Sequence, residues 1–224
     1  MTQFLLTHKD SVIVLSGGLD STTLLYEEQE RVALAVSFEY GSNHNSRELG
    51  CARRHCERLG VEHIVITLDF FKRYFHSSLL DGYEAVPSGS YDDDNMRSTV
   101  VPFRNGIMLS IACGIAESRG LQRVLIANHG GDHAIYPDCR PEFISAIDAA
   151  AQAGTYIKVK VEAPYTKLTK SDIVRRGSEL GVDYADTYSC YCGGERHCGH
   201  CGTCTERREA FQMAGIPDPT PYED

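Results

Sequence analysis

The sequence contains no tryptophan, no excess of positive charge and no long uninterrupted apolar run. Its formal net charge is −9, which disfavours a nucleic acid or another large polyanion as a partner. No apolar run approaches the roughly 20 residues that span a bilayer. The N-terminal stretch MTQFLLTHKD also lacks the basic and apolar regions of a secretory signal. We therefore expect a cytoplasmic protein with no membrane partner.

Two common glycine-rich nucleotide motifs are also missing, the GxxxxGK[ST] loop and the GxGxxG fingerprint. The chain carries instead the stretch VLSGGLDSTT, residues 14–23, between an apolar run and a helix that we expect to begin near Ser21. Gly17 and Gly18 can take positive φ and let the backbone approach a ligand closely. Amide groups at the start of a helix favour an anion, so this turn predicts a phosphate site.

Apolar runs alternate with segments of helical periodicity along most of the chain. The expected strands are 11–16, 31–40, 63–69, 123–128 and 156–164. The expected helices are 46–59, 104–119, 141–153 and 170–180. This alternation predicts an α/β fold with a doubly wound, mostly parallel sheet.

Two segments depart from the alternation. Residues 81–99 hold Gly, Pro, Ser and three successive aspartates, which predicts either a solvated loop or a lid over a site. After residue 188 the composition shifts to Cys, Gly and His. We therefore expect an α/β domain over 1–187 and a small module over 188–224.

Nine cysteines in a cytoplasmic chain indicate metal binding or catalysis rather than disulfides. Cys198, Cys201 and Cys204 form a CxxCxxC motif, and Cys190 and Cys192 precede it. Four thiolates around a tetrahedral Zn²⁺ make a closed structural site, which is the favoured interpretation. An iron–sulfur cluster also uses closely spaced cysteines and is the alternative.

The other cysteines and the nearby histidines receive simpler interpretations. His197 and His200 are expected to support the metal site or to face solvent rather than to bind the metal. Cys51, Cys56 and Cys113 fall on expected helices, where core packing is the usual role.

The stretch SGGLDST resembles the SGGxDS pyrophosphate loop of the ATP pyrophosphatase, or PP-loop, superfamily. The resemblance implies that ATP binds here and is split between its α and β phosphates, with transfer of AMP to a substrate. Asp20 would help to hold Mg²⁺ on the phosphates. Lys170, at the start of an expected helix, opposes the helix dipole unless an anion lies nearby. The residues expected to bind ATP are Leu15, Ser16, Gly17, Gly18, Leu19, Asp20, Ser21, Thr22, Thr23 and Lys170.

Three further stretches resemble the 7-cyano-7-deazaguanine synthase family (QueC), over about residues 11–217: TVVPFRNGIMLSIA (99–112), GGDHAIYPDCRPEF (130–143) and the terminal cysteine block. The resemblance implies an ATP-dependent carbon–nitrogen ligase that converts 7-carboxy-7-deazaguanine and ammonia to 7-cyano-7-deazaguanine, a precursor of queuosine. It also implies a homodimer. The implied zinc ligands are Cys190, Cys198, Cys201 and Cys204, with Cys192 as an addition.

Six residues are candidates for catalysis or substrate binding: Asp20, Arg104, Asp132, Tyr136, Asp138 and Arg140. The carboxylate of Asp132 or Asp138 could accept two hydrogen bonds from a guanine-like base, and Tyr136 could stack on it. Arg104 or Arg140 could pair with the substrate carboxylate or a phosphate. The alternative for Asp138 and Arg140 is a local ion pair or helix cap.

Phe103 and Ile135 stand where the QueC family usually has glycine. Both are expected to bring bulk close to the substrate wall. These departures leave open a related ligase that couples a deazapurine carboxylate to another amine. A PP-loop tRNA sulfurtransferase is a further alternative, but a net charge of −9 and 224 residues leave little room for an RNA-binding face or domain.

Overall fold

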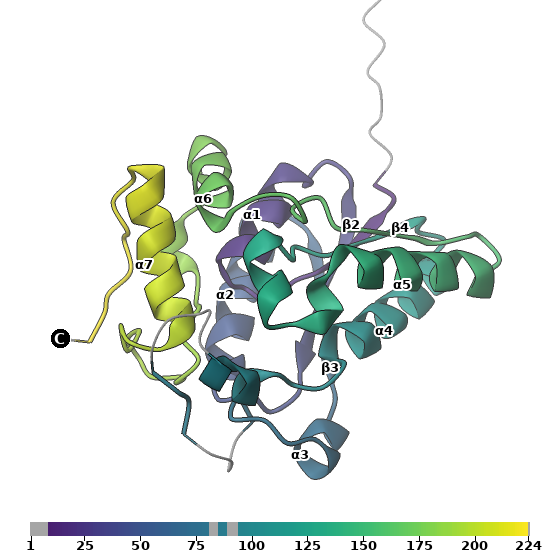
Figure 1. Ribbon diagram of the computed structural model, residues 1–224. Coiled ribbons are helices and arrows are strands. Elements are labelled where there is room, and N and C mark those ends of the chain that lie inside the picture. The colour runs from purple at the N-terminus through teal and green to yellow at the C-terminus, as the bar shows by residue number, and fades with distance from the viewer. Residues whose placement is uncertain (1–8, 81–84, 89–93, 224) are drawn as a thin grey trace, which may run out of the picture.

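The computed structural model describes residues 9–80, 85–88 and 94–223. These residues form one parallel sheet of five strands in the order β3-β2-β1-β4-β5 (Figure 1). The strands are β1 (Ser11–Val14), β2 (Val32–Glu39), β3 (Glu62–Thr67), β4 (Arg123–Leu125) and β5 (Lys160–Glu162). The strand order reverses between β1 and β4, and open α/β sheets bind ligands outside the carboxyl ends of the strands at such a point.

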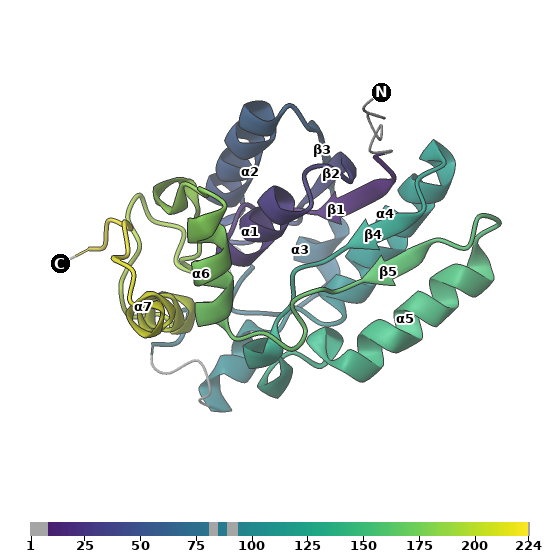
Figure 2. The same ribbon diagram turned by 90° about the horizontal axis from the view of Figure 1, so that it is seen from above.

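Helices cover both faces of the sheet, as the view in Figure 2 shows. One face carries α1 (Leu19–Glu27), α2 (Asn45–Leu59) and α6 (Lys170–Glu179), with α7 (Gly202–Ala214) packed on α6. The other face carries α3 (Phe70–Tyr74), α4 (Arg104–Arg119) and α5 (Pro141–Gly154). In the described part of the connections lie four 3₁₀ turns: η1 (Asp94–Thr99), η2 (Gly130–Ala134), η3 (Pro137–Cys139) and η4 (Tyr184–Asp186). The predicted doubly wound α/β fold is confirmed.

Successive strand residues point to opposite faces of the sheet, and here both faces are buried. Ile13 and Ala35 pack against α1, α2 and α6, whereas Val12 and Leu34 pack against α4. This double burial explains why the strands read as continuous apolar runs rather than as alternating ones.

The observed elements differ from the expected ones mainly near the C-terminus. Strand β5 keeps only three residues of 156–164, because the chain turns before it at Lys158, which has a φ of 55°. Helix α7 was not predicted, since it begins inside the cysteine block and few of its residues are apolar. Ala210 and Phe211 nevertheless place it in the same core as α1 and α6.

The expected loop 81–99 is only partly described, because 81–84 and 89–93 lie outside the described residues. Within it, Asp94–Thr99 form η1. The Oγ atom of Ser88 lies 3.0 Å from Nδ1 of His200, and the backbone of Ser88 pairs with that of Cys201. This part of the loop therefore contacts the cysteine block.

The segment Met96–Arg119, which includes α4, has the length and apolar composition of a membrane-spanning helix, contrary to our expectation. Half of its most apolar stretch is buried inside the structure. Met108, Leu109 and Ala112 of α4 lie in the core between the sheet and α5. Packing of α4 against the sheet therefore accounts for its apolar side chains.

Candidate functional site

The loop between β1 and α1 passes close against α2, and this contact requires a glycine. Gly17 has a φ of 94°, and a Cβ atom there would lie 2.1 Å from the carbonyl oxygen of Glu48. Gly18 differs from our expectation, because its φ is −77° and it serves as the N-cap of α1. Of the two glycines, only Gly17 thus takes the positive φ that favours glycine.

Two serine hydroxyl groups hold the loop in shape. Ser21 Oγ accepts hydrogen bonds from the backbone N–H groups of Ser16 (3.2 Å) and Gly17 (3.3 Å). Ser16 Oγ accepts one from the N–H of Gly18 at 3.1 Å and lies 2.9 Å from Ser21 Oγ. These hydrogen bonds fix the turn at the start of α1, where the backbone N–H groups of the first helical turn and the helix dipole favour a phosphate.

Lys170, the first residue of α6, lies in a buried group of carboxylates beside this loop. Its Nζ atom is 2.5 Å from Glu206 Oε2 and 3.4 Å from Asp20 Oδ2. Burial alone would lower the pKa of Lys170, but Asp20, Glu206 and Asp132 together raise it above its usual value. Burial also raises the pKa of Glu206, although Lys170 and His129 oppose this. Lys170 is therefore a largely buried cation that carboxylates hold at the phosphate-binding loop.

The other oxygen of Asp20 has a different environment. Among the described residues, no group donates a hydrogen bond to Oδ1 of Asp20, although this atom is buried. A buried carboxylate oxygen without a donor suits a cation, and Mg²⁺ prefers carboxylate and phosphate oxygens. The donor set therefore fits the predicted magnesium role of Asp20, in which the ion would neutralise charge on the phosphates.

Asp132 is fixed by a capping box at the start of η2, directly after β4. Its Oδ2 atom accepts a hydrogen bond from the backbone N–H of His129 at 3.0 Å, while Nδ1 of His129 accepts one from the N–H of Gly131 at 3.1 Å. The His129 proton is therefore on Nε2, which lies 3.6 Å from Asp132 Oδ1 and 3.8 Å from Glu206 Oε1. The loop after β4 thus brings Asp132 to the Lys170 group.

Arg104 begins α4 on the opposite side of the cleft. It donates a hydrogen bond to the hydroxyl group of Tyr40 at 3.2 Å. Burial alone would lower the pKa of Arg104, but Tyr40, Tyr191 and Asp138 raise it, so its charge is retained. A buried guanidinium facing the cleft suits a carboxylate or phosphate.

Asp138 and Cys139 support the start of α4. Oδ2 of Asp138 accepts a hydrogen bond from the backbone N–H of Asn105 at 2.8 Å, so it acts as a helix cap. Asn105 Nδ2 donates to the sulfur of Cys139 at 3.2 Å. Burial raises the pKa of Cys139, which keeps it a thiol and agrees with a role outside nucleophilic catalysis.

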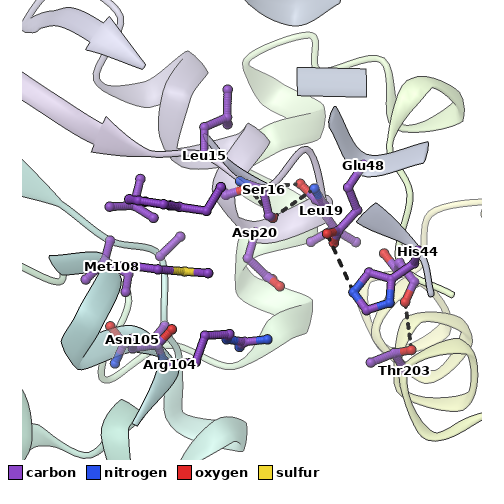
Figure 3. A pocket seen from close by; sticks show the side chains of 18 of the residues that line it. Leu15, Ser16, Leu19, Asp20, His44, Glu48, Arg104, Asn105, Met108 and Thr203 are labelled. Atoms are coloured by element: carbon purple, nitrogen blue, oxygen red, sulfur yellow. Dashed lines mark hydrogen bonds and ion pairs between the residues drawn. The ribbon is translucent and has the colours of Figure 1, made fainter. Parts of the chain in front are cut away.

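Most of the predicted site residues line one cleft (Figure 3). Those that do are Leu15, Ser16, Gly18, Leu19, Asp20, Ser21, Arg104, Asp132, Tyr136 and Lys170. Those that do not are Gly17, Thr22, Thr23, Asp138 and Arg140. Thr23 instead points into the core, where its hydroxyl group is 2.9 Å from that of Tyr184. The cleft joins the phosphate-binding loop to the side that carries Arg104 and Asp132.

Tyr136 lines the cleft from the loop after β4, but it is almost fully buried. Its hydroxyl group lies 3.0 Å from that of Tyr191 and 3.0 Å from Oγ1 of Thr99. A ring held at its hydroxyl end by two partners is fixed in orientation. Tyr136 is therefore part of a rigid wall, whether or not a base stacks on it.

Phe103 stands away from the cleft wall, contrary to our expectation, whereas Ile135 lies directly behind that wall, because Tyr136 and Cys139, against which it packs, both line the cleft. Neither Phe103 nor Ile135 is among the residues that line it. The side chain of Phe103 is exposed and meets Phe143 of α5 edge-on, with ring centroids 5.7 Å apart. Ile135 packs against the buried pair Tyr136 and Cys139.

Sequence reasoning missed the residues that reach the cleft from distant elements. Helix α2 contributes Glu48, and His44 directly precedes it; the cysteine block contributes Ser189, Tyr191 and Thr203. No local motif marks His44 or Glu48, and the cysteine block was expected to bind a metal rather than to line the cleft. The loop after η4 is also tied to the phosphate-binding loop, because the N–H of Tyr188 donates to the carbonyl oxygen of Gly17 at 3.1 Å.

The terminal cysteines gather into one cluster. The Sγ atoms of Cys190, Cys192, Cys198 and Cys201 all lie within 4.8 Å of one another. Cys204 Sγ lies 4.0 Å from Cys198 Sγ. In a tetrahedral site with zinc–sulfur bonds of about 2.3 Å, neighbouring sulfurs lie about 3.8 Å apart. The cluster can therefore hold a metal ion, as the sequence predicts.

The cluster shares three cysteines with the predicted ligand set and differs in the fourth. Cys192 belongs to the mutually close group but is exposed, whereas Cys204 is buried. His197 is not among the grouped ligands, and its Nε2 accepts a hydrogen bond from the N–H of Ser189 at 3.0 Å. His197 thus shapes the cysteine loop. The choice of Cys204 as the fourth ligand stays a prediction.

The remaining cysteines have the expected structural role. Cys51, Cys56 and Cys113 are buried, and burial raises the pKa of Cys51 and Cys113 to about 11 and that of Cys56 to about 12. They are therefore neutral thiols at physiological pH. Cys56 and Cys113 belong to the cores on the two faces of the sheet.

We predict that Cys201→Ser lowers the metal content from about one ion per chain to near zero, because it removes a thiolate from the centre of the cluster. Cys192→Ser serves as the matched control and should keep the ion, since Cys192 is exposed. Metal analysis of the purified proteins measures both. Loss of metal from Cys192→Ser alone would show that Cys192, and not Cys204, completes the site, and bound iron with visible colour would support a cluster.

Comparison with known proteins identifies the family of this chain. The family model described as "Queuosine biosynthesis protein QueC" matches residues 10–215. The chain belongs to the QueC family. The resemblance that the sequence motifs indicated is therefore confirmed.

The QueC relatives cover nearly the whole chain. The 7-cyano-7-deazaguanine synthase of Porphyromonas gingivalis is 63% identical over 215 residues, which are 96% of this chain and 98% of that protein. Proteins of the same name from Desulfotalea psychrophila and Caldicellulosiruptor bescii are 50% and 47% identical, each over 95% of this chain and over 98% and 97% of their own lengths. The family match over residues 10–215 includes both the α/β part of the chain and the cysteine block.

Proposed function

We propose that this protein converts 7-carboxy-7-deazaguanine and ammonia to 7-cyano-7-deazaguanine at the expense of ATP, through an adenylate and an amide. The observation that carries the proposal is the single cleft that joins the phosphate-binding loop and Lys170 to Arg104 and Asp132. One end of the cleft suits phosphates and the other suits a polar bicyclic base with a carboxylate. Membership in the QueC family selects this reaction among those of ATP-dependent ligases.

The chemistry requires two activations of the same carbon. A carboxylate oxygen leaves as hydroxide only with difficulty, but transfer of AMP to it creates a good leaving group. Ammonia then displaces AMP and forms the amide. The amide oxygen is activated by a second ATP, and loss of AMP forms the nitrile. One cleft serves both steps if the amide stays bound, because its reacting carbon is already in place.

In this proposal the described residues take distinct roles. Ser16, Gly18 and Ser21 hold the pyrophosphate part of ATP, and Lys170 neutralises its charge. Asp20 holds Mg²⁺, which would screen the phosphates during transfer. Arg104 pairs with the substrate carboxylate, and Asp132 reads the polar edge of the base. The cysteine cluster holds a structural Zn²⁺ that keeps the wall around Ser189 and Thr203 in place.

A direct assay tests the proposal. The protein is incubated with ATP, Mg²⁺, 7-carboxy-7-deazaguanine and ammonium, and the products are identified by mass spectrometry. We expect the nitrile together with about two AMP and two pyrophosphate molecules per nitrile, and accumulation of the 7-amido compound when ATP is limiting. Supplied with ATP alone, the amide should also become the nitrile. Release of ADP and phosphate, or failure to convert the amide, would contradict the scheme.

We further propose that the enzyme works as a cytoplasmic homodimer, as the resemblance to the QueC family implies. Light scattering of the purified protein would give the mass of the assembly. A monomer at working concentrations would contradict the dimer. Neither Phe103 nor Ile135 itself lines the cleft, so the described lining gives no reason to prefer another amine as the substrate.

A further inference from the structure

Glu48 on α2 brings a carboxylate into the cleft. Neither the phosphate-binding loop nor the substrate motifs predict a carboxylate at this position. Glu48 lines the cleft, and its side chain is 14% exposed. Its Oε1 atom would lie 3.8 Å from a Cβ atom placed on Gly18, so the carboxylate lies directly beside the phosphate-binding loop. Figure 3 shows it near Ser16 and Leu19, facing His44.

The three acidic side chains that line the described cleft are held differently. Asp20 lies beside Lys170, and Asp132 is fixed in its capping box. No hydrogen bond to the Glu48 carboxylate is found among the described residues. Its nearest ionisable partner is His44, whose Nε2 atom lies 3.6 Å from Oε2, beyond normal hydrogen-bond length. Glu48 is therefore the acid of this cleft that is available to exchange a proton with a ligand.

The surroundings of Glu48 also favour proton exchange near neutral pH. Burial raises the pKa of Glu48 to about 8, although Arg104 across the cleft opposes this. Burial, assisted by Arg104, lowers the pKa of His44 to about 4, so the imidazole is neutral at pH 7. Lys170 cannot serve as a base instead, because the surrounding carboxylates keep it protonated. A carboxyl group that titrates near the working pH is suited to accept and return protons.

We propose that Glu48 is the general base that removes protons from nitrogen in both half-reactions of the proposed function. The reacting carbon must lie between the α-phosphate at the loop and the base-binding side at Arg104. Glu48 is beside the loop, and it lies within the electrostatic reach of Arg104. The carboxylate and the reacting carbon therefore face the same space.

The proton balance assigns Glu48 a task in each half-reaction. In the first, ammonium gives one proton to Glu48 and becomes ammonia. The nitrogen of ammonia then forms the C–N bond while the C–O bond to AMP breaks. The amide keeps two of the three ammonia protons, and the third leaves with AMP. In the second, Glu48 has returned its first proton to water; the amide oxygen attacks the α-phosphorus of ATP, and pyrophosphate leaves with one N–H proton of the amide. Glu48 then takes the last N–H proton as the nitrile forms and the C–O bond to AMP breaks.

Glu48→Gln keeps the shape of the side chain and removes the base. We expect nitrile formation from the acid, and separately from the amide, to fall by about 10²–10⁴-fold. Adenylation of the acid, measured by exchange of labelled pyrophosphate into ATP, should stay close to wild type. Glu48→Asp should restore part of both nitrogen steps. Glu57→Gln, an exposed residue of the same helix, is the matched control and should be fully active.

The outcomes separate this proposal from the proposed function and from a folding defect. Glu48→Gln should melt at about the wild-type temperature, because glutamine has the size of the protonated acid and, like it, carries no charge that burial would penalise. Equal loss of pyrophosphate exchange and nitrile formation would assign Glu48 to ATP binding and overturn the base role. Retention of nitrile formation would also overturn it. Failure of the wild-type protein to make the nitrile would instead contradict the proposed function itself.

Discussion

Asp20→Asn should lower pyrophosphate release with saturating ATP, Mg²⁺ and acid substrate by about 100-fold or more, without unfolding the protein. Asparagine keeps the size of the side chain but removes the charge that Mg²⁺ requires. The buried Oδ1 atom of Asp20 has no hydrogen-bond donor among the described residues, which is the position expected of a metal-facing oxygen. The substitution also removes one of the carboxylates that hold Lys170 in place.

The control for this experiment is Asp183→Asn. Asp183 is exposed and lies 3.7 Å from Arg58 on the surface, so its loss should leave the rate unchanged. Circular dichroism and the melting temperature establish that both variants are folded. A wild-type rate in Asp20→Asn at saturating Mg²⁺ would contradict the role of Asp20, whereas a reduced rate with a higher Mg²⁺ requirement would support it.

Arg207→Met should reduce the free energy of unfolding by about 3–5 kcal/mol, which is a large fraction of the stability of a typical domain. Arg207 on α7 is fully buried. Its guanidinium donates to the carbonyl oxygen of Tyr184 (2.9 Å) and to the hydroxyl groups of Thr187 (2.9 Å) and Ser189 (3.2 Å). It also lies 3.4 Å from the carboxylate of Asp218. Methionine fills much of the space but removes the donor to the Thr187 and Ser189 hydroxyl groups and the positive charge beside the Asp218 carboxylate.

The neighbouring residue of the same helix provides the control. Arg208 is exposed and stacks on Tyr222, with its guanidinium carbon 3.8 Å from the ring centroid. Arg208→Met should therefore cost about 1 kcal/mol or less. Chemical denaturation of the metal-loaded proteins measures both values. Similar stabilities of the two variants would show that the buried network around Arg207 contributes little.

Pattern alone predicted the elements near the phosphate-binding loop. Buried parallel strands must be apolar on both faces, and this made runs such as 31–40 recognisable. The loop itself was recognisable because a tight turn before a helix needs specific residues at specific positions, as Gly17 and Ser21 show. The cysteine block was equally clear, because thiolates of one metal site must be close in space and here are close in sequence.

Other features of the site were invisible in the sequence. Helix α7 is held in place by packing on α6 and by the hydrogen bonds of Arg207. The spacing of its few apolar residues therefore gives little indication of a helix. Glu206 follows Cys204 without any motif, yet it holds Lys170 at 2.5 Å. The placement of Phe103 was also misjudged, because its exposed ring packs beside α5, outside the cleft lining.

The sequence by itself therefore determined the α/β class, the anion-binding loop, the cysteine cluster and the family, because each depends on residues that are neighbours along the chain. Only the tertiary structure decided which acids enter the cleft and with what surroundings. Glu48 and Lys170 are 122 positions apart in sequence, and both line the same cleft only because the fold brings their helices together at the carboxyl edge of the sheet. The burial and the neighbouring charges that set the proton affinity of a side chain exist only once the chain has folded.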